Sequence, residues 1–128
     1  MKDCYPILIT PSDNMYVVYI PDFTINTEGY TLTDAIEMAR DAIGLMGIEY
    51  EDSGKPIPAG SSLASVEGEE GDIKTLVDVD FTEYRRQNDQ RVVKKNCTIP
   101  SWLCYKAEQA GINFSQVLQK ALKEELKI

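Results

Sequence analysis

Three polar side chains alternate near the end of the sequence, within the segment RVVKKNCTIPSWL at residues 91–103. Lys94, Asn96 and Thr98 are separated by one residue each, and an extended chain places alternate side chains on one face. An ammonium, an amide and a hydroxyl group in a row can hydrogen-bond to donors and acceptors on a flat surface. The spacing therefore predicts a recognition strand.

The residue types that support nucleophilic or zinc chemistry are missing or badly spaced. The chain has no histidine, and its three cysteines, Cys4, Cys97 and Cys104, form no CxxC pair. Nucleophiles that depend on a histidine base are therefore excluded, and a zinc site is not expected. We expect the cysteines to be small, mostly buried hydrophobic residues.

Carboxylates are the remaining groups that could catalyse a reaction. Hydrolysis of RNA by two metal ions needs several carboxylates that converge on the metals. Asp22, Asp78 and Asp80 qualify by residue type, but nothing in their spacing indicates convergence. We therefore expect a protein that is not an enzyme and that uses no metal or cofactor.

Charge is distributed unevenly along the 128 residues, whose formal net charge is −8. Residues 1–80 hold 4 Lys or Arg against 16 Asp or Glu, a net charge of −12, whereas residues 91–128 hold 7 against 3, a net charge of +4. This asymmetry predicts two surfaces that meet different partners. No apolar run approaches the ~20 residues of a membrane span, and we expect a cytoplasmic protein without a membrane partner.

The strands of a small α+β domain are indicated within the first 80 residues. Residues 5–10 and 15–20 are rich in β-branched and aromatic residues, and the sequence PSDN between them favours a hairpin turn. A third short strand is expected at residues 23–28, and residues 73–80 alternate as a fourth strand would. Residues 51–72 are expected to be loop, because Gly, Pro, Ser and acidic residues dominate them.

One helix is expected between the third and fourth strands. Thr31 and Asp34 form a capping box, and the helix should run to about Leu45, with Gly44 and Gly47 marking its frayed end. Its apolar positions recur at helical spacing and predict one buried stripe, composed of Leu32, Ala35, Ile36, Ala39, Ala42, Ile43 and Met46. The order β-β-β-α-β predicts a helix packed on a mostly antiparallel sheet.

A second module is predicted at residues 91–128, after a linker or short helix at residues 81–90. Its strand, residues 92–99, ends at Pro100, and two helices follow, separated by a left-handed turn at Gly111. Asn113 and Gln116 form a capping box for the second helix. The strand face opposite the polar row carries Val93, Lys95, Cys97 and Ile99.

A module of 38 residues is too small to bury an adequate core alone, and its single strand has an unpaired edge. Pairing with the same strand of a second copy solves both problems and makes a two-stranded ribbon, which fits the major groove of B-DNA. Lys94, Asn96 and Thr98 would then face the bases, while Lys95 and Arg91 contact the sugar-phosphate backbone. The amide groups at the start of the second helix would bind a phosphate; they belong to Asn113, Phe114 and Ser115.

Two sequence patterns resemble known families. The pattern TIPSWL…AGINFSQVLQKAL is similar to ribbon-helix-helix repressors. The pattern YPILI…YVVYIPDF…TEGYTLTDAIEMARDAI resembles the HicB family of antitoxins, although residues 21–26, PDFTIN, lack a glycine that many members carry. The two resemblances together cover most of the chain.

The resemblance implies a division of labour. Residues 1–80 would form a partial RNase H-like domain that binds and blocks HicA, a small basic toxin that cleaves mRNA. Asp22, Glu28 and Asp34 are the candidate toxin contacts. Residues 91–128 would form a homodimer, or a higher oligomer, and repress the operon through operator DNA.

Three alternatives remain open from the sequence. In the first alternative, residues 91–128 only form a dimer, and their lysines are exposed by chance. In the second, the N-terminal domain is an RNase H-type hydrolase. In the third, the chain is a stand-alone ribbon-helix-helix repressor whose N-terminal domain senses a ligand. A gene for a short basic protein beside this one would favour the antitoxin over the sensor.

Overall fold

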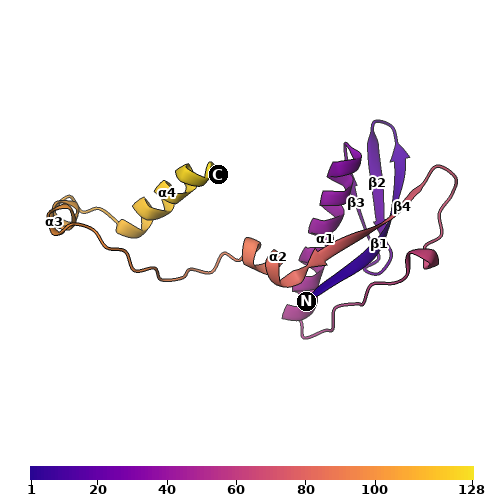
Figure 1. Ribbon diagram of the computed structural model, residues 1–128, viewed down its shortest axis with the longest axis horizontal. Coiled ribbons are helices and arrows are strands. Elements are labelled where there is room, and N and C mark those ends of the chain that lie inside the picture. The colour runs from indigo at the N-terminus through magenta and orange to yellow at the C-terminus, as the bar shows by residue number, and fades with distance from the viewer. The chain divides into compact units, whose positions relative to one another are not determined.

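Four antiparallel strands form the sheet in the first part of the chain, in a computed structural model that describes residues 1–128 (Figure 1). They are β1 (Lys2–Ser12), β2 (Met15–Ile20), β3 (Ile25–Gly29) and β4 (Ile73–Asp80), and their order across the sheet is β3-β2-β1-β4. The predicted α+β class and the β-β-β-α-β order are therefore confirmed. β3 and β4 are the two edges of the sheet.

The first two strands form the predicted hairpin, but β1 is longer than residues 5–10. It extends toward the N-terminus because it pairs there with β4, with Lys2 opposite Asp80, and toward the C-terminus because Pro11 and Ser12 pair with β2. Ser12 pairs with Met15, so the hairpin turn is short, and Asn14 adopts a φ of 59° there. Asparagine tolerates this left-handed conformation better than most residues, which explains its place in the turn.

The third strand begins later than predicted. Residues 21–24 form a turn, in which the Phe23 amide group donates to the Ile20 carbonyl and the Thr24 amide group donates to the Pro21 carbonyl. The turn places the Phe23 side chain in the core, where its ring centroid lies 5.1 Å from that of Tyr5. The strand therefore starts at Ile25 and pairs with Ile20 of β2.

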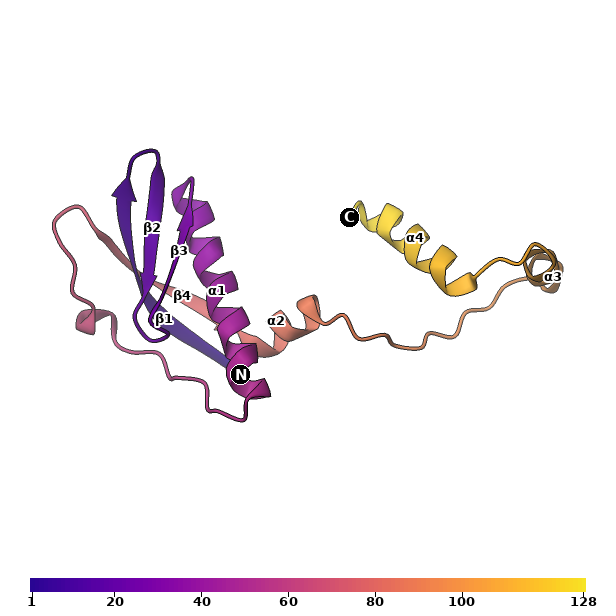
Figure 2. The same cartoon turned by 180° about the vertical axis from the view of Figure 1, so that it is seen from behind.

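Helix α1 (Leu32–Asp52) lies along one face of the sheet, as both views show (Figures 1 and 2). Its start matches the prediction, because the Thr31 hydroxyl group accepts a hydrogen bond of 3.0 Å from the Asp34 amide group. The predicted apolar stripe is buried or partly buried, except for Leu32, which is 40% exposed. The core between helix and sheet is formed by Tyr5, Ile7, Ile9, Val18, Ile20, Phe23, Ala35, Ala39, Ile43, Val77, Val79 and Phe81.

The predicted end of this helix near Leu45 is wrong. The helix continues for two more turns because Gly44 and Gly47 are packing positions for helix α2 (Phe81–Asn88). A Cβ atom on Gly44 would lie 2.5 Å from the Tyr84 ring, and one on Gly47 would lie 2.3 Å from the Phe81 ring. Close packing of two aromatic rings outweighs the helical cost of about 1 kcal/mol per glycine.

The loop between α1 and β4 is attached to the sheet through hydrogen bonds. The Tyr5 hydroxyl group donates to the Pro58 carbonyl at 2.7 Å, and the Gly60 amide group donates to Asp3 at 2.9 Å. A Cβ atom on Gly60 would lie 1.8 Å from the Cys4 carbonyl oxygen, so only glycine allows this approach. A 3-10 helix, η1 (Leu63–Ser65), contacts β1 and β4 within this loop.

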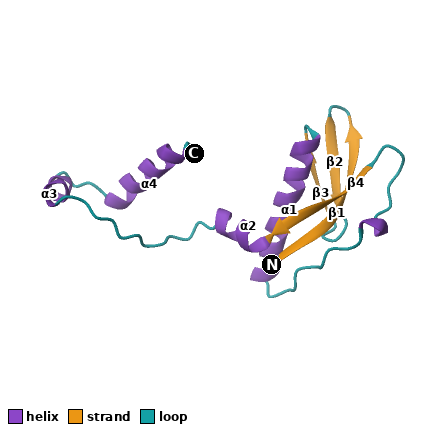
Figure 3. Cartoon of the chain, viewed as in Figure 1, coloured by secondary structure: helices purple, strands orange, loops and turns teal.

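The chain divides after Gln90, and Arg91–Ile128 form a second unit with two helices, α3 (Ser101–Gln109) and α4 (Phe114–Leu126). The predicted glycine turn is confirmed, since Gly111 adopts a φ of 68°. Residues 89–100 contain neither helix nor strand (Figure 3). The predicted strand at residues 92–99 would need a second chain for pairing and stays a prediction.

None of the helices is both long enough and apolar enough to cross a bilayer. The expectation of mostly buried cysteines is wrong: Cys4 and Cys97 are exposed and Cys104 is half-buried. For Cys97 and Cys104 the reason is the open structure of the second unit, in which no residue is fully buried.

Candidate functional site

The second unit contains an apolar groove of about 670 Å³ between its extended segment and its two helices. Cys97 and Ile99 line it from the segment, together with the side chain of Lys95. The helices and the turn between them contribute a larger apolar set, which comprises Leu103, Cys104, Ala107, Ile112, Phe114, Val117, Leu118 and Ala121. The groove is therefore the core of the unit, left open on one side.

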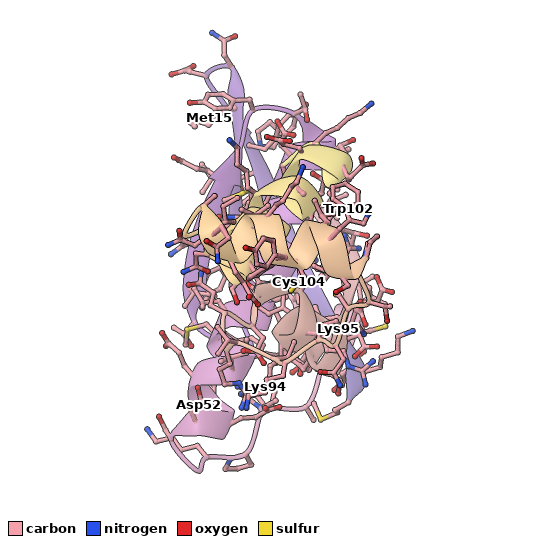
Figure 4. All side chains as sticks on the ribbon, turned by 90° about the vertical axis from the view of Figure 1, so that its left-hand side faces the viewer. Met15, Asp52, Lys94, Lys95, Trp102 and Cys104 are labelled. Atoms are coloured by element: carbon pink, nitrogen blue, oxygen red, sulfur yellow. The ribbon has the colours of Figure 1, made fainter.

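The polar row predicted for base recognition lies outside this groove. Lys94, Asn96 and Thr98 are exposed and do not line it, whereas their neighbours Lys95 and Cys97 do. Figure 4 labels the two adjacent lysines on the segment. The segment thus separates its residues into an apolar side and a polar side, as an extended chain does.

The start of α4 has part of the geometry that an anion-binding site needs. The Asn113 side chain accepts a hydrogen bond of 3.1 Å from the Gln116 amide group, which confirms the predicted cap. Helix geometry leaves the amide groups of Phe114 and Ser115 without an acceptor inside the helix. The Phe114 side chain, however, lines the groove, so only its backbone is available to a phosphate.

Large apolar side chains are exposed throughout the single-chain tail. Thirteen of the 21 large exposed hydrophobic residues lie within residues 91–128, although this unit is less than a third of the chain. Trp102, labelled in Figure 4, is on α3. Its side chain is 62% exposed, with the Lys106 Nζ atom 5.7 Å from the centre of its ring, and Phe114 is 44% exposed. A monomeric protein rarely exposes so many large apolar side chains in one small unit.

The three predicted toxin contacts do not form one site. Glu28 and Asp34 line a cleft between the end of β3 and the start of α1. Asp22 lies apart from it, since its carboxylate accepts hydrogen bonds from the amide and hydroxyl groups of Ser61. Its contact with the loop gives Asp22 a structural role.

The other carboxylates considered for catalysis are also separate and occupied. Arg40 donates to the Asp78 carboxylate at 3.1 Å, and this hydrogen bond holds the pKa of Asp78 below its ordinary value. Asp80 caps α2 by accepting a hydrogen bond of 3.1 Å from the Glu83 amide group. No group of three metal-ligating side chains is assembled anywhere in the chain.

The cleft also contains residues that the sequence did not single out. Met15, Tyr30, Glu37 and Met38 line it together with Glu28 and Asp34. They come from β2, the turn after β3, and α1, so sequence spacing alone does not place them together. The sequence feature that could have indicated the cleft is Tyr30, a large aromatic residue between a strand and a helix cap. Its side chain is 77% exposed in the structure.

Comparison with known families covers both units. Residues 5–121 match the family described as HicB-like antitoxin of bacterial toxin-antitoxin system. The chain belongs to this family. The HicB resemblance is therefore confirmed over almost the whole chain, whereas no curated protein sequence matches it.

Solved structures agree with the HicB-like assignment. One chain, from a toxin-antitoxin complex from Streptococcus pneumoniae, is 26% identical with a TM-score of 0.60, and the alignment covers 98% of this chain and 99% of that one. The antitoxin HicB of Burkholderia pseudomallei is 25% identical with a TM-score of 0.54, covering 98% and 97%. A chain of the HicA3 and HicB3 toxin-antitoxin complex, 24% identical with a TM-score of 0.51 over 60% and 98%, shares the fold.

Proposed function

We propose that this HicB-like chain neutralises a HicA-type, mRNA-cleaving toxin through residues 1–90 and represses its own operon through residues 91–128. The observation that carries the proposal is the family match, which runs through both units from residue 5 to residue 121. Structures described as toxin-antitoxin complexes are among the similar folds. In this proposal the first unit has a partial RNase H-like fold and the second a ribbon-helix-helix fold.

Charge supports a basic protein partner for the first unit. Residues 1–90 hold 6 Lys or Arg against 18 Asp or Glu, a net charge of −12. An acidic surface accelerates the encounter with a basic protein and disfavours acidic competitors. A small basic toxin fits this surface, and the toxin is the partner that the family implies.

The open groove supports a homodimer for the second unit. A second copy would cover the groove with its own apolar side and pair the two extended segments antiparallel. The polar rows of both copies would then lie on one exposed ribbon face, which carries Lys94, Asn96 and Thr98 twice. Such a ribbon fits the major groove, where lysine hydrogen-bonds to guanine and asparagine to adenine.

Binding, and not hydrolysis, is the proposed activity of the first unit. Asp22, Asp78 and Asp80 contact Ser61, Arg40 and the start of α2, respectively. Carboxylates held in three separate structural contacts do not converge on a pair of metal ions. Metal-dependent cleavage of labelled RNA that is abolished by Asp22→Asn would overturn this part of the proposal.

Co-expression with the product of the adjacent toxin gene tests the proposal as a whole. We expect the two proteins to purify together, cell growth to recover when this chain is present, and a gel shift of the operon's promoter DNA. Growth arrest that persists despite a folded, abundant chain would contradict the antitoxin function. A promoter fragment that never shifts would contradict the repressor function alone.

A further inference from the structure

The cleft at the start of α1 is an apolar depression of about 320 Å³ on the first unit. Its apolar lining comes from Met15, Tyr30 and Met38, and carboxylates surround it at Glu28, Asp34 and Glu37. Tyr30 is 77% exposed and Met38 is 45% exposed, so both side chains are open to a partner. Exposed tyrosine and methionine are typical of the centres of protein interfaces.

The backbone around the cleft is fixed before any partner arrives. A Cβ atom on Gly29 would lie 2.4 Å from the Ala35 nitrogen atom, so glycine lets the end of β3 contact the first turn of α1. Thr31 caps that same turn through the Asp34 amide group. A preformed wall reduces the entropy that binding would otherwise cost.

The three carboxylates at the cleft have no cation of their own. Elsewhere in this unit Asp78 pairs with Arg40, and Glu51 and Asp52 pair with Arg85. Glu28, Asp34 and Glu37 form no side-chain hydrogen bond or ion pair, and no Lys or Arg lines the cleft. The start of α1 contributes only about half a positive charge, which is much less than the three negative charges nearby.

An arginine or lysine side chain complements both the apolar lining of this cleft and its unpaired carboxylates. Its aliphatic stem can lie against the methionine side chains, while its charged end reaches the carboxylates. The face of Tyr30 adds a cation–π contact. A second copy of the first unit fits poorly, because each copy has a net charge of −12.

We propose that this cleft, and not the region of Asp22, receives an arginine or lysine side chain from the toxin. The proposal rests on the proposed antitoxin function for the identity of the basic protein. It assigns toxin contacts to Tyr30, Glu37 and Met38 in addition to Glu28 and Asp34. Asp22 lies outside the set, because its carboxylate binds Ser61 and it does not line the cleft.

Matched charge variants of the full chain test the proposal. Glu28→Gln/Glu37→Gln removes two charges at the cleft, and the control Glu67→Gln/Glu70→Gln removes two charges from the exposed loop. Both change the net charge by +2, so long-range attraction weakens equally. We expect the cleft variant to bind the co-expressed toxin at least about tenfold more weakly than the control in surface plasmon resonance.

A matched pair of lysine variants tests the apolar lining of the cleft without removing a carboxylate. Tyr30→Lys places a cation inside the cleft, and Leu76→Lys places one on β4, where Leu76 is 47% exposed. We expect only Tyr30→Lys to weaken toxin binding, with both variants keeping the thermal stability of the native chain. Equal binding by Tyr30→Lys and Leu76→Lys would overturn the cleft proposal and leave the antitoxin function intact. A native chain that does not bind the toxin would overturn both.

Discussion

Asn96→Ala is the perturbation that separates base recognition from every other role of the second unit. Asn96 is exposed, lies outside the apolar groove and forms no hydrogen bond within the chain. Its removal should therefore change the free energy of unfolding by less than about 0.5 kcal/mol. The dimer and the binding of toxin should be unaffected, since neither uses this side chain.

The expected effect on DNA follows from the twofold arrangement. A bidentate contact of asparagine with adenine is worth about 1–3 kcal/mol of discrimination, and a dimer has two such contacts. The loss of about 2–6 kcal/mol corresponds to weakening by roughly thirtyfold or more. Fluorescence anisotropy with promoter DNA measures it directly.

A control and the salt dependence complete this experiment. Asn26→Ala removes an exposed asparagine from β3 and should leave DNA binding unchanged. Asn96→Ala should keep the native salt slope because it removes no phosphate contact, whereas Arg91→Gln, at a predicted phosphate contact outside the groove, should reduce the slope by about 2 per dimer. An Asn96→Ala variant that binds promoter DNA with native affinity would refute base recognition by the ribbon.

Three further outcomes test the first unit. Gly47→Ala should lower the free energy of unfolding by about 1–3 kcal/mol in urea titrations, because its new methyl group overlaps the Phe81 ring, and a gain in stability would contradict the packing argument. Burial raises the pKa values of Tyr5 and Tyr84 to about 12. The stability that the two phenol groups contribute is therefore complete below about pH 10 and is lost as the pH rises toward 12. A urea midpoint that is flat over this pH range would contradict this prediction. A fragment of residues 1–90 retains the buried Phe81 and should fold alone and protect cells from the toxin. A fragment of residues 1–80 should be much less stable, and equal stability of the two fragments would contradict a structural role for α2.

Local signals in the sequence were sufficient for the starts of α1 and α4 and for most strands. Thr31 and Asn113 cap their helices through residues three positions away, so a short window contains the whole interaction. The β-branched and aromatic run at residues 15–20 and the alternation in residues 73–80 likewise depend on neighbours alone, and both segments became strands.

Interactions between distant residues explain what the sequence did not predict. Gly44 and Gly47 indicated the end of a helix, but rings more than thirty residues later use them as packing positions. The hydrogen bond between Asp22 and Ser61 joins residues 39 positions apart, which no local pattern indicates. The cleft combines side chains from β2, β3 and α1, which no single periodicity links.

Sedimentation equilibrium of the full chain at micromolar concentration tests the central claim most directly, because DNA recognition requires two tails to pair. The account predicts a mass of at least twice the 14.4 kDa of one chain. It also predicts that Leu118→Glu, which places a charge in the groove, shifts the mass toward that of one chain. A native protein that sediments as a single chain at every micromolar concentration would contradict the account.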